Sequence, residues 1–314
     1  MIEMFNINNY VIDTSNFDHA LHSSHVKNFE EKVCEFVGAK YACGVSSATN
    51  AIFLSLLNKS QAVKIPTIIP PVVINAVVNG GNKVEFIDDP FWVGDSYVLH
   101  QFDDYKIVDS AQKLEKNQFK KECNDNDLMI FSFYPTKPVG SLDGGMVVSN
   151  DLSKIEWFRE ATLNGMSYDK NNWERRVKFP GWKMYLSSIQ AYVGLKNLEK
   201  LDEKNSRLKE VQESYNKAFN YTNSSMHLYR ISVKDREVFL KSMKENNIRC
   251  GIHYKCSHLM DAYKDISNPR SLDMTLSRKN SENTVSIPFN ETLTPTDVKT
   301  IIGAAKKTGL ILNE

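Results

Sequence analysis

Residues 128–148 read LMIFSFYPTKPVGSLDGGMVV. Two short apolar runs, 128–133 and 146–148, flank a loop that contains Lys137 and several glycines. Continuous apolar runs of this length are typical of strands buried on both faces. A lysine just past such a strand can form a Schiff base, because its pKa falls readily when the amine is desolvated. The stretch therefore predicts a buried sheet with a candidate reactive amine, and a solvated loop lysine is the alternative.

Helices and strands alternate on the N-terminal side of this stretch. A helix is expected over 26–37, where apolar residues fall at helical spacing and Gly38 stands at the stop position. Further helices are expected at 48–57 and 71–78, and strands at 41–46, 63–65, 83–87 and 105–108. Alternation of this kind favours an α/β fold with a mainly parallel sheet.

The C-terminal third has a different pattern. A long helix is expected over 186–218, and the later expected elements are a strand at 228–233, a helix at 237–246 and a last helix entered through Thr294 and Pro295. No Pro/Gly/Ser-rich linker separates the two patterns. We therefore expect a large α/β domain over 1–205 and a small α+β domain over 206–314, with the boundary inside the long helix.

Composition narrows the function classes. The 314 residues carry 39 Lys and Arg against 38 Asp and Glu, a net charge of +1, which argues against a nucleic-acid partner. The longest apolar stretch is too short and too interrupted for a membrane span, and the first residues do not resemble a signal peptide. Five scattered cysteines do not form a disulfide framework. We expect a cytoplasmic protein without a membrane partner.

Two further segments could bind an anionic or cationic ligand. The turn Ser46-Ser47-Ala48-Thr49-Asn50 joins a strand to a helix, where free N–H groups and the helix dipole favour an anion; simple helix capping is the alternative. Asp109 ends an apolar strand, the place where open α/β sheets bind ligands, although it could instead cap a helix.

A cluster near the C-terminus has the residue types of a metal site. Cys250, His253, Cys256 and His258 could in principle supply four zinc ligands. Their spacing is tighter than the usual two-knuckle arrangement, which weighs against zinc.

These segments, in this order, resemble the DegT/DnrJ/EryC1/StrS family of pyridoxal-phosphate-dependent nucleotide-sugar aminotransferases. The matching motifs are Ser-Ser-Ala-Thr at 46–49, Asp-Ser-Ala-Gln at 109–112, Ser-Phe-Tyr-Pro-Thr-Lys at 132–137 and Asp-Gly-Gly at 143–145. Blocks at 181–202, 253–263 and 286–294 extend the similarity over nearly the whole chain. The resemblance implies fold type I, an α/β fold with a mostly parallel central sheet, flanking helices and a smaller α+β C-terminal domain.

The resemblance also implies roles for three residues at the cofactor ring. Lys137 would form the internal aldimine with pyridoxal 5'-phosphate and carry the proton between substrate and cofactor. Asp109 would pair with the pyridinium nitrogen and keep the ring an electron sink. Gln112 would lie near the phenolic oxygen. No metal is implied.

The cofactor phosphate would be held by residues from two segments. Ala48 and Thr49, at the start of a helix, would bind it together with Ser132. The family usually has an asparagine that reaches the phosphate of the neighbouring subunit, and Lys183 stands at that position. The resemblance therefore implies a homodimer with composite active sites, in which Lys183 meets the phosphate as a charge.

The chain also departs from the family pattern at two other positions. Pro70 stands where the family has an aromatic residue stacked on the cofactor ring, and Tyr185 replaces the usual arginine. The chain is also shorter than the family, in part between 89 and 101. These departures keep a non-catalytic member of the fold as an alternative.

The function implied is transfer of an amino group from an amino acid, with glutamate expected, to a nucleotide-linked ketosugar by a ping-pong mechanism. Polysaccharide biosynthesis, including that of O-antigen, is the expected setting. A dehydratase-like reaction is a further alternative, but the dehydratase relatives carry histidine at the position of Lys137.

Overall fold

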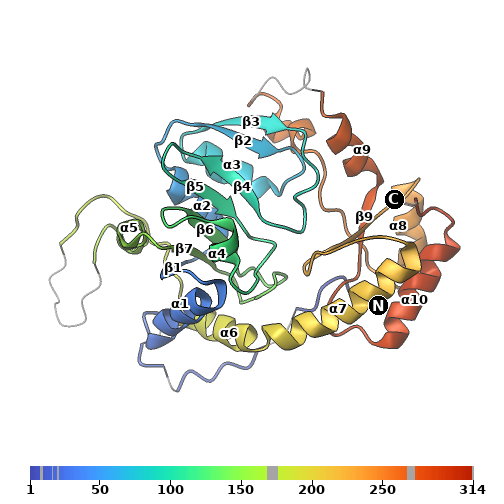
Figure 1. The fold of residues 1–314 in the computed structure, drawn as a ribbon, viewed down its shortest axis with the longest axis horizontal. Helices are drawn as coiled ribbons and strands as arrows, with labels where there is room; N and C mark the ends of the chain where they lie inside the picture. Colours follow the sequence, from blue (N-terminus) through green and yellow to red (C-terminus); the bar gives the residue numbers. More distant parts are fainter. Residues whose placement is uncertain (8–9, 16, 20, 168–175, 267–272, 313–314) are drawn as a thin grey trace.

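The computed structural model describes all residues except 8–9, 16, 20, 168–175, 267–272 and 313–314 (Figure 1). The helices in the described part are α1 (Ser24–Val37), α2 (Ala48–Leu56), α3 (Pro71–Asn79), α4 (Gln118–Glu122), α5 (Leu152–Thr162), α6 (Ser188–Glu199), α7 (Leu201–Phe219), α8 (Arg236–Glu245), α9 (Thr275–Asn283) and α10 (Pro295–Lys307). The strands are β1 (Tyr41–Val45), β2 (Ala62–Pro66), β3 (Lys83–Ile87), β4 (Tyr97–Gln101), β5 (Lys106–Asp109), β6 (Leu128–Ser132), β7 (Gly145–Ser149), β8 (Tyr229–Ser232) and β9 (Thr284–Ile287).

The central sheet has five strands in the order β1-β7-β6-β5-β4, and β2 and β3 form a separate parallel pair. The α/β class is confirmed, but the expectation of a mostly parallel sheet is wrong in detail. Of the four pairings in the central sheet, only β5 with β6 is parallel. The connection explains the difference for one pair, because the link from β4 to β5, residues 102–105, is too short to hold the helical crossover that parallel strands need.

Alternate residues of the central strands enter two hydrophobic clusters, one on each face of the sheet. Ile130 and Val147 join the cluster around α2 and α3, whereas Met129 and Val148 join the cluster around α1 and α6. All four side chains are fully buried. Burial on both faces is the reason why these strands read as continuous apolar runs in the sequence.

Most expected elements of the N-terminal half are found within a residue or two. The strand expected at 83–87 is β3, and the helices expected at 48–57 and 71–78 are α2 and α3. Gly38 ends α1 in the left-handed conformation, with φ of 80°, and its N–H bonds to the carbonyl oxygen of Cys34. The edge strand β4 and the helix α5 were not expected.

The long helix expected over 186–218 is two helices, α6 and α7, which meet at Lys200 (Figure 1). α6 begins with a capping box between Ser187 and Gln190. Leu201, at the start of α7, packs with the N-terminal elements, whereas Leu208, two turns later, packs with the C-terminal elements. α7 thus spans both parts of the molecule, and the domain boundary expected near residue 205 remains a prediction.

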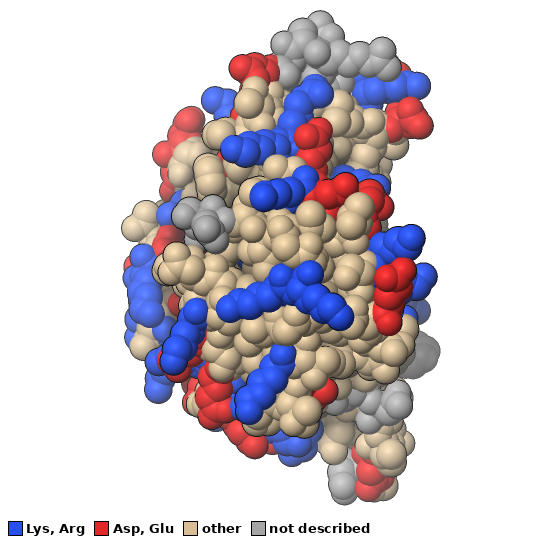
Figure 2. Space-filling model, turned by 90° about the vertical axis from the view of Figure 1, so that its right-hand side faces the viewer, with Lys and Arg blue, Asp and Glu red and all other residues tan. Residues whose placement is uncertain are grey.

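The C-terminal elements surround the antiparallel pair β8–β9. Residues from α7, α8 and α10 pack on one face of this pair and form a third hydrophobic cluster. Figure 2 shows the side of the molecule that these elements form, where basic and acidic side chains lie among uncharged ones. In the described part of the chain, no helix combines the length and the apolar character needed to cross a membrane.

Candidate active site

Lys137 and Asp109 follow two neighbouring parallel strands. Asp109 is the last residue of β5 and pairs with Ile130 of β6. Lys137 lies in the loop after β6, where its N–H donates to the carbonyl oxygen of Tyr134 at 2.8 Å. Because parallel strands end at the same edge of a sheet, the structure brings these two expected catalytic residues to one site.

The Asp109 carboxylate is buried and held by two donors. Its Oδ2 accepts a hydrogen bond of 2.9 Å from the hydroxyl of Tyr97, and its Oδ1 accepts one of 3.0 Å from the N–H of Ala111. Burial raises the pKa of Asp109, while these hydrogen bonds and the nearby Lys137 amine lower it. Both oxygens are therefore fixed at the end of β5.

The Lys137 amine has a pKa much closer to neutral pH than that of an ordinary lysine. Burial lowers its pKa to about 8, and the Asp109 carboxylate opposes that change. A lysine in this state carries a substantial fraction of neutral amine near pH 7 to 8. The neutral form is the one that acts as a nucleophile or as a base.

Gln112 is buried, with its amide fixed on both sides. Its Oε1 accepts a hydrogen bond of 2.9 Å from the N–H of Gly94, and its Nε2 donates one of 3.2 Å to the hydroxyl of Tyr254. Tyr254 belongs to the His-Tyr motif of the C-terminal part. Gln112 thus links the end of β5 to that part of the chain.

The expected phosphate site forms around the start of α2. Ser47 caps this helix by accepting from the N–H of Asn50. Gly145 pairs with Ser132 across the β6–β7 ladder. A Cβ at position 145 would lie 2.5 Å from the nitrogen of Ala48, so glycine is needed for this close approach. The approach brings Ser132 to the helix end that carries Ala48 and Thr49.

Lys183 is exposed on a segment that borders the same turn. The next residue, Met184, accepts a hydrogen bond of 2.7 Å from the N–H of Ser46. Tyr185 forms a bridge to Val45 and places its ring 4.4 Å from that of His22. Among the described residues, the Lys183 side chain forms no hydrogen bond or ion pair with a site residue, and its role remains a prediction.

The four residues considered as zinc ligands do not converge. His253 Nδ1 lies 2.9 Å from the hydroxyl of Ser286, and His258 Nδ1 lies 2.5 Å from the hydroxyl of Thr67. Nowhere in the described ranges do three or more His, Cys, Asp or Glu side chains form a group that could hold a metal ion. The zinc alternative finds no support.

Pro70 lies just before α3, as its N-cap, and is half-buried. Two hydrogen bonds hold the preceding segment against the C-terminal part. Ser257 donates from its N–H to the carbonyl oxygen of Thr67 and from its hydroxyl to the carbonyl oxygen of Ile69. At position 70 the chain therefore offers an aliphatic ring on a fixed segment in place of an aromatic face.

Sequence reasoning missed three polar residues that surround this site. Tyr97 comes from the unexpected strand β4 and bonds to Asp109. His227 is buried, and burial together with the nearby Lys137 amine holds its pKa well below its usual range. Arg230 lies on β8 beside Tyr254, whose phenol counteracts the burial that lowers the pKa of this guanidinium. Only the fold places these residues near Lys137, because they lie 40 to 93 positions away.

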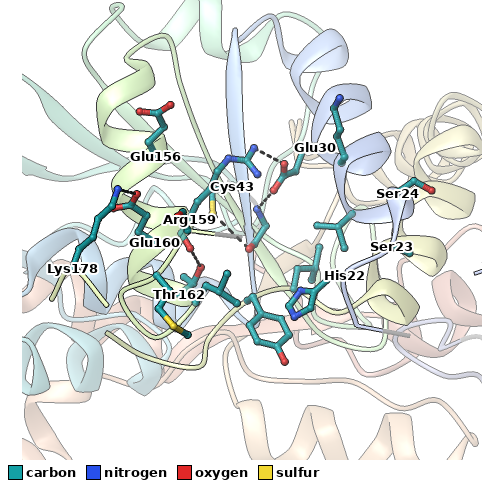
Figure 3. A pocket seen from close by; sticks show the side chains of 18 residues that line it. His22, Ser23, Ser24, Glu30, Cys43, Glu156, Arg159, Glu160, Thr162 and Lys178 are labelled. Carbon is teal, nitrogen blue, oxygen red and sulfur yellow. Dashed lines mark hydrogen bonds and ion pairs between the residues drawn. The ribbon is translucent and has the colours of Figure 1, made fainter. Parts of the chain in front are cut away.

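A pocket of about 680 Å³ lies elsewhere in the molecule (Figure 3). Two ion pairs lie among its lining side chains, Arg159 with the buried Glu30 and Lys178 with Glu160. None of the expected catalytic or cofactor-binding residues lines it. We therefore place the active site at Lys137 and not in this pocket.

The fold and the site define a class of protein. The chain has the fold of the type I pyridoxal-phosphate-dependent transferases, as shown by an aminotransferase from Streptoalloteichus hindustanus, TlmJ, with a TM-score of 0.81, 20% identity and 98% of each chain covered. An aminotransferase of Helicobacter pylori involved in pseudoaminic acid biosynthesis, PseC, has a TM-score of 0.78 at 20% identity, covering 98% of this chain and 99% of the other.

The family follows from the sequence. Residues 3–89 and 105–306 match the model of the DegT/DnrJ/EryC1/StrS aminotransferase family, so the chain belongs to that family. A curated relative of Campylobacter jejuni, named UDP-4-amino-4,6-dideoxy-N-acetyl-beta-L-altrosamine transaminase, is 27% identical over 87% of both chains. A spore coat polysaccharide biosynthesis protein of Bacillus subtilis, SpsC, is 25% identical over 90% of this chain and 88% of that protein.

Members of this family are pyridoxal-phosphate-dependent aminotransferases, and the residues described here fit that cofactor. Asp109 presents a buried carboxylate suited to a pyridinium nitrogen, and Lys137 presents an amine with a lowered pKa. The glycine-lined approach of β7 to the first turn of α2 leaves helix N–H groups for a phosphate. The chain is thus an enzyme of the aminotransferase class.

Proposed function

We propose that this enzyme transfers an amino group from glutamate to the keto carbon of a nucleotide-linked sugar, in two half-reactions of ping-pong type. The observation that carries the proposal is the Lys137 amine with its lowered pKa, beside the doubly hydrogen-bonded Asp109. The names of the curated relatives support a nucleotide-linked sugar as the acceptor and polysaccharide biosynthesis as the setting.

Each of the site residues has a distinct task in this proposal. Pyridoxal phosphate, when bound, supplies a carbonyl that accepts the amino group and a ring that takes up an electron pair. Lys137 holds the cofactor at rest and moves the proton from the donor Cα. Asp109 keeps the ring nitrogen protonated, and Gln112 orients the phenolic oxygen. These assignments rest on the placement of the side chains at the ends of β5 and β6.

The phosphate would be bound by the first turn of α2. The N–H groups of Ala48 and Thr49 and the hydroxyls of Thr49 and Ser132 are the donors that we assign to it. A helix N-terminus favours a dianion of this kind, because its unpaired N–H groups carry partial positive charge.

We further propose that the active enzyme is a homodimer in which Lys183 meets the phosphate of the partner subunit. The exposure of Lys183 supports this assignment. Light scattering of the cofactor-loaded protein at micromolar concentration should give twice the monomer mass. A monomer that retains cofactor and turns over would contradict the shared site.

The test of the function is a screen of the purified protein against nucleotide-linked ketosugars with glutamate, read by mass spectrometry. Replacement of a keto oxygen by an amino group is the expected product, with 2-oxoglutarate formed in equal amount. A cofactor absorbance spectrum separates the alternatives, because a non-catalytic protein would not convert its cofactor on addition of any amino acid. Loss of a sugar hydroxyl without amination would instead indicate a dehydratase.

A further inference from the structure

The pair of strands β8–β9 has one face that is polar and yet largely buried. Arg230 pairs with Ser286, and Ser232 pairs with Thr284, so these four side chains share a face. The alternate residues of both strands fill the C-terminal hydrophobic cluster. Ser286 is completely buried and Thr284 is 6% exposed. A strand face that carries polar residues normally meets water, so this face requires another explanation.

The polar face borders a pocket of about 530 Å³ next to the candidate active site. Arg230, Ser232 and Thr284 line the pocket from the C-terminal side. Gln112 and Pro138 line it from the other side. Pro138 directly follows Lys137 in the chain, and Gln112 is one of the expected cofactor-binding residues, so the pocket borders the two segments that carry Lys137 and Asp109.

Arg230 has unused hydrogen-bonding capacity in this pocket. One of its terminal nitrogens donates to Asn280 Oδ1. Its Nε is buried without a hydrogen-bond partner, as is the hydroxyl oxygen of Thr284. Burial lowers the pKa of Arg230 only to about 10, so the guanidinium stays charged at neutral pH. Burying a cation that has an unpaired N–H costs free energy unless a ligand accepts a hydrogen bond from that N–H.

The other charged side chains that line the pocket are one lysine and two carboxylates. Lys113 Nζ lies 2.8 Å from Asp95 and 3.9 Å from Glu115, so both carboxylates are paired with the lysine. Within the described residues, no carboxylate lies at ion-pair distance from Arg230. Arg230 is therefore the cation of this pocket that has no carboxylate partner in the described part of the chain.

We propose that Arg230 binds a carboxylate group of the amino donor in this pocket. The inference rests on the proposed aminotransferase function and adds the residue that recognises its first substrate. A guanidinium binds a carboxylate through two parallel N–H bonds, and the unpartnered Nε of Arg230 can supply one of them. The Thr284 hydroxyl would supply a further donor. A pocket of this volume is large enough for an amino acid.

The test compares Arg230→Gln with Arg236→Gln in the cofactor-loaded protein. Arg236 is the matched control, because its Nε is also buried without a hydrogen-bond partner but it lies outside the pocket. Single-turnover conversion of the cofactor is followed by absorbance at increasing L-glutamate. Isothermal titration with glutarate, a dicarboxylate without an amino group, measures binding independently of turnover.

In Arg230→Gln we expect the apparent dissociation constants of glutamate and glutarate to rise by about tenfold or more, with cofactor content unchanged. Arg236→Gln should stay within about twofold of wild type. Arg230→Lys keeps the charge but loses the paired N–H groups, so its dissociation constants should lie between those of wild type and Arg230→Gln. This variant tests the assignment if the glutamine variant does not fold. Unchanged glutamate and glutarate binding in the Arg230 variants would overturn the assignment.

The same experiment separates this inference from the proposed function. Wild-type protein that converts its cofactor with glutamate, alongside an equally competent Arg230→Gln variant, would refute the carboxylate site and leave the aminotransferase standing. Wild-type protein that converts with no amino acid would refute the aminotransferase. Weaker binding of a nucleotide-linked amino sugar, with glutamate binding intact, would assign Arg230 to the second substrate and overturn the proposal.

Discussion

The hydroxyl of Tyr97 donates a 2.9 Å hydrogen bond to Oδ2 of Asp109. The two residues are direct partners across the antiparallel pair β4–β5. Tyr97 lies in residues 90–104, the internal segment that the family model does not match. This chain therefore fixes its Asp109 carboxylate with a residue from a segment of its own, and Tyr97 is a positioning residue for the cofactor ring.

Replacing Tyr97 by phenylalanine should reduce catalysis while leaving the fold intact. The hydrogen bond lowers the pKa of Asp109, so its loss should raise that pKa and weaken the pairing of Asp109 with the ring nitrogen. We expect kcat to fall by about 10- to 100-fold, the range for a hydrogen bond to a charged group of roughly 1.5–3 kcal/mol. The pH titration of the cofactor absorbance should shift at the same time.

Tyr215 provides the matched control for this substitution. Its hydroxyl donates to the carbonyl oxygen of Pro288, also at 2.9 Å, in the C-terminal core. Tyr215→Phe should lower the midpoint of thermal unfolding without changing the cofactor spectrum. Equal effects of both variants on kcat and on the spectrum would show that Tyr97 is merely structural.

Asp109→Asn should lower catalysis far more than stability. The amide oxygen of asparagine can still accept from the N–H of Ala111, and its NH2 group can donate to the Tyr97 hydroxyl oxygen in place of accepting from it, so the local structure should persist. The charge that holds the ring nitrogen protonated would be lost, and removing one partner of a buried pair costs about 3–5 kcal/mol. We expect kcat to fall by more than about 100-fold, with an unfolding midpoint close to that of wild type. Turnover close to that of wild type would show that Asp109 does not act in catalysis.

The lowered pKa of Lys137 should appear in the rate at which cofactor-free protein takes up pyridoxal phosphate. Only the neutral amine reacts, so the rate should rise with pH and level off above about pH 8. Because Asp109 raises the pKa of Lys137, the Asp109→Asn variant should reach its plateau at a lower pH. Stopped-flow absorbance checks both curves, and a rate that keeps rising toward pH 10 would show an ordinary solvated lysine.

Lys183→Ala should weaken cofactor retention several-fold and make it less sensitive to salt, because a charge that meets the phosphate is screened by ions. Lys183→Asn should restore most of the affinity through its amide. Lys196, an exposed lysine paired with Glu199, is the control and should have no effect as alanine. Dissociation constants of pyridoxal phosphate at low and high ionic strength test this. Equal values for wild type and Lys183→Ala would show that Lys183 does not contact the phosphate.

Gly145→Ala should damage both stability and cofactor binding. The new methyl group would lie 2.5 Å from the nitrogen of Ala48 and force β7 and α2 apart, at a cost of about 1–3 kcal/mol. Gly303 is the matched control, because a Cβ there meets nothing within 4 Å and alanine favours its helix α10. Chemical denaturation should separate the two, and an unaffected Gly145→Ala would refute the close approach.

The sequence predicted the helices and strands that have a clear local pattern, such as an apolar run in a buried strand or a capping box at a helix start. Continuous apolar runs marked β6 and β7 because both faces of the sheet are covered. The capping box at Thr294 marked the start of α10, where the structure shows both reciprocal hydrogen bonds. β4 was missed because it is a short edge strand of mixed composition, and strand direction was missed because an apolar run is the same in either direction.

Some residues of the candidate site were predicted from the sequence and others were not. Lys137 and Asp109 were predicted because each follows a buried strand directly in the sequence, and the short motifs around them are specific in combination. Arg230 and Tyr97 gave no such signal. A tyrosine beside two apolar residues and an arginine between two apolar residues are ordinary in any sequence.

By itself, the sequence determined which strands are buried, where several helices begin, and which lysine and aspartate come at or after the end of a buried strand, because those features depend on residues close together in the chain. Only the tertiary structure decided that these two strands are neighbours, that Tyr97 faces Asp109, and that Arg230 lines a pocket with no carboxylate at ion-pair distance among the described residues. The physical reason is that pairing across a sheet and packing between separate parts of the chain join residues far apart in sequence, and no local pattern encodes which polar group will be left unpaired.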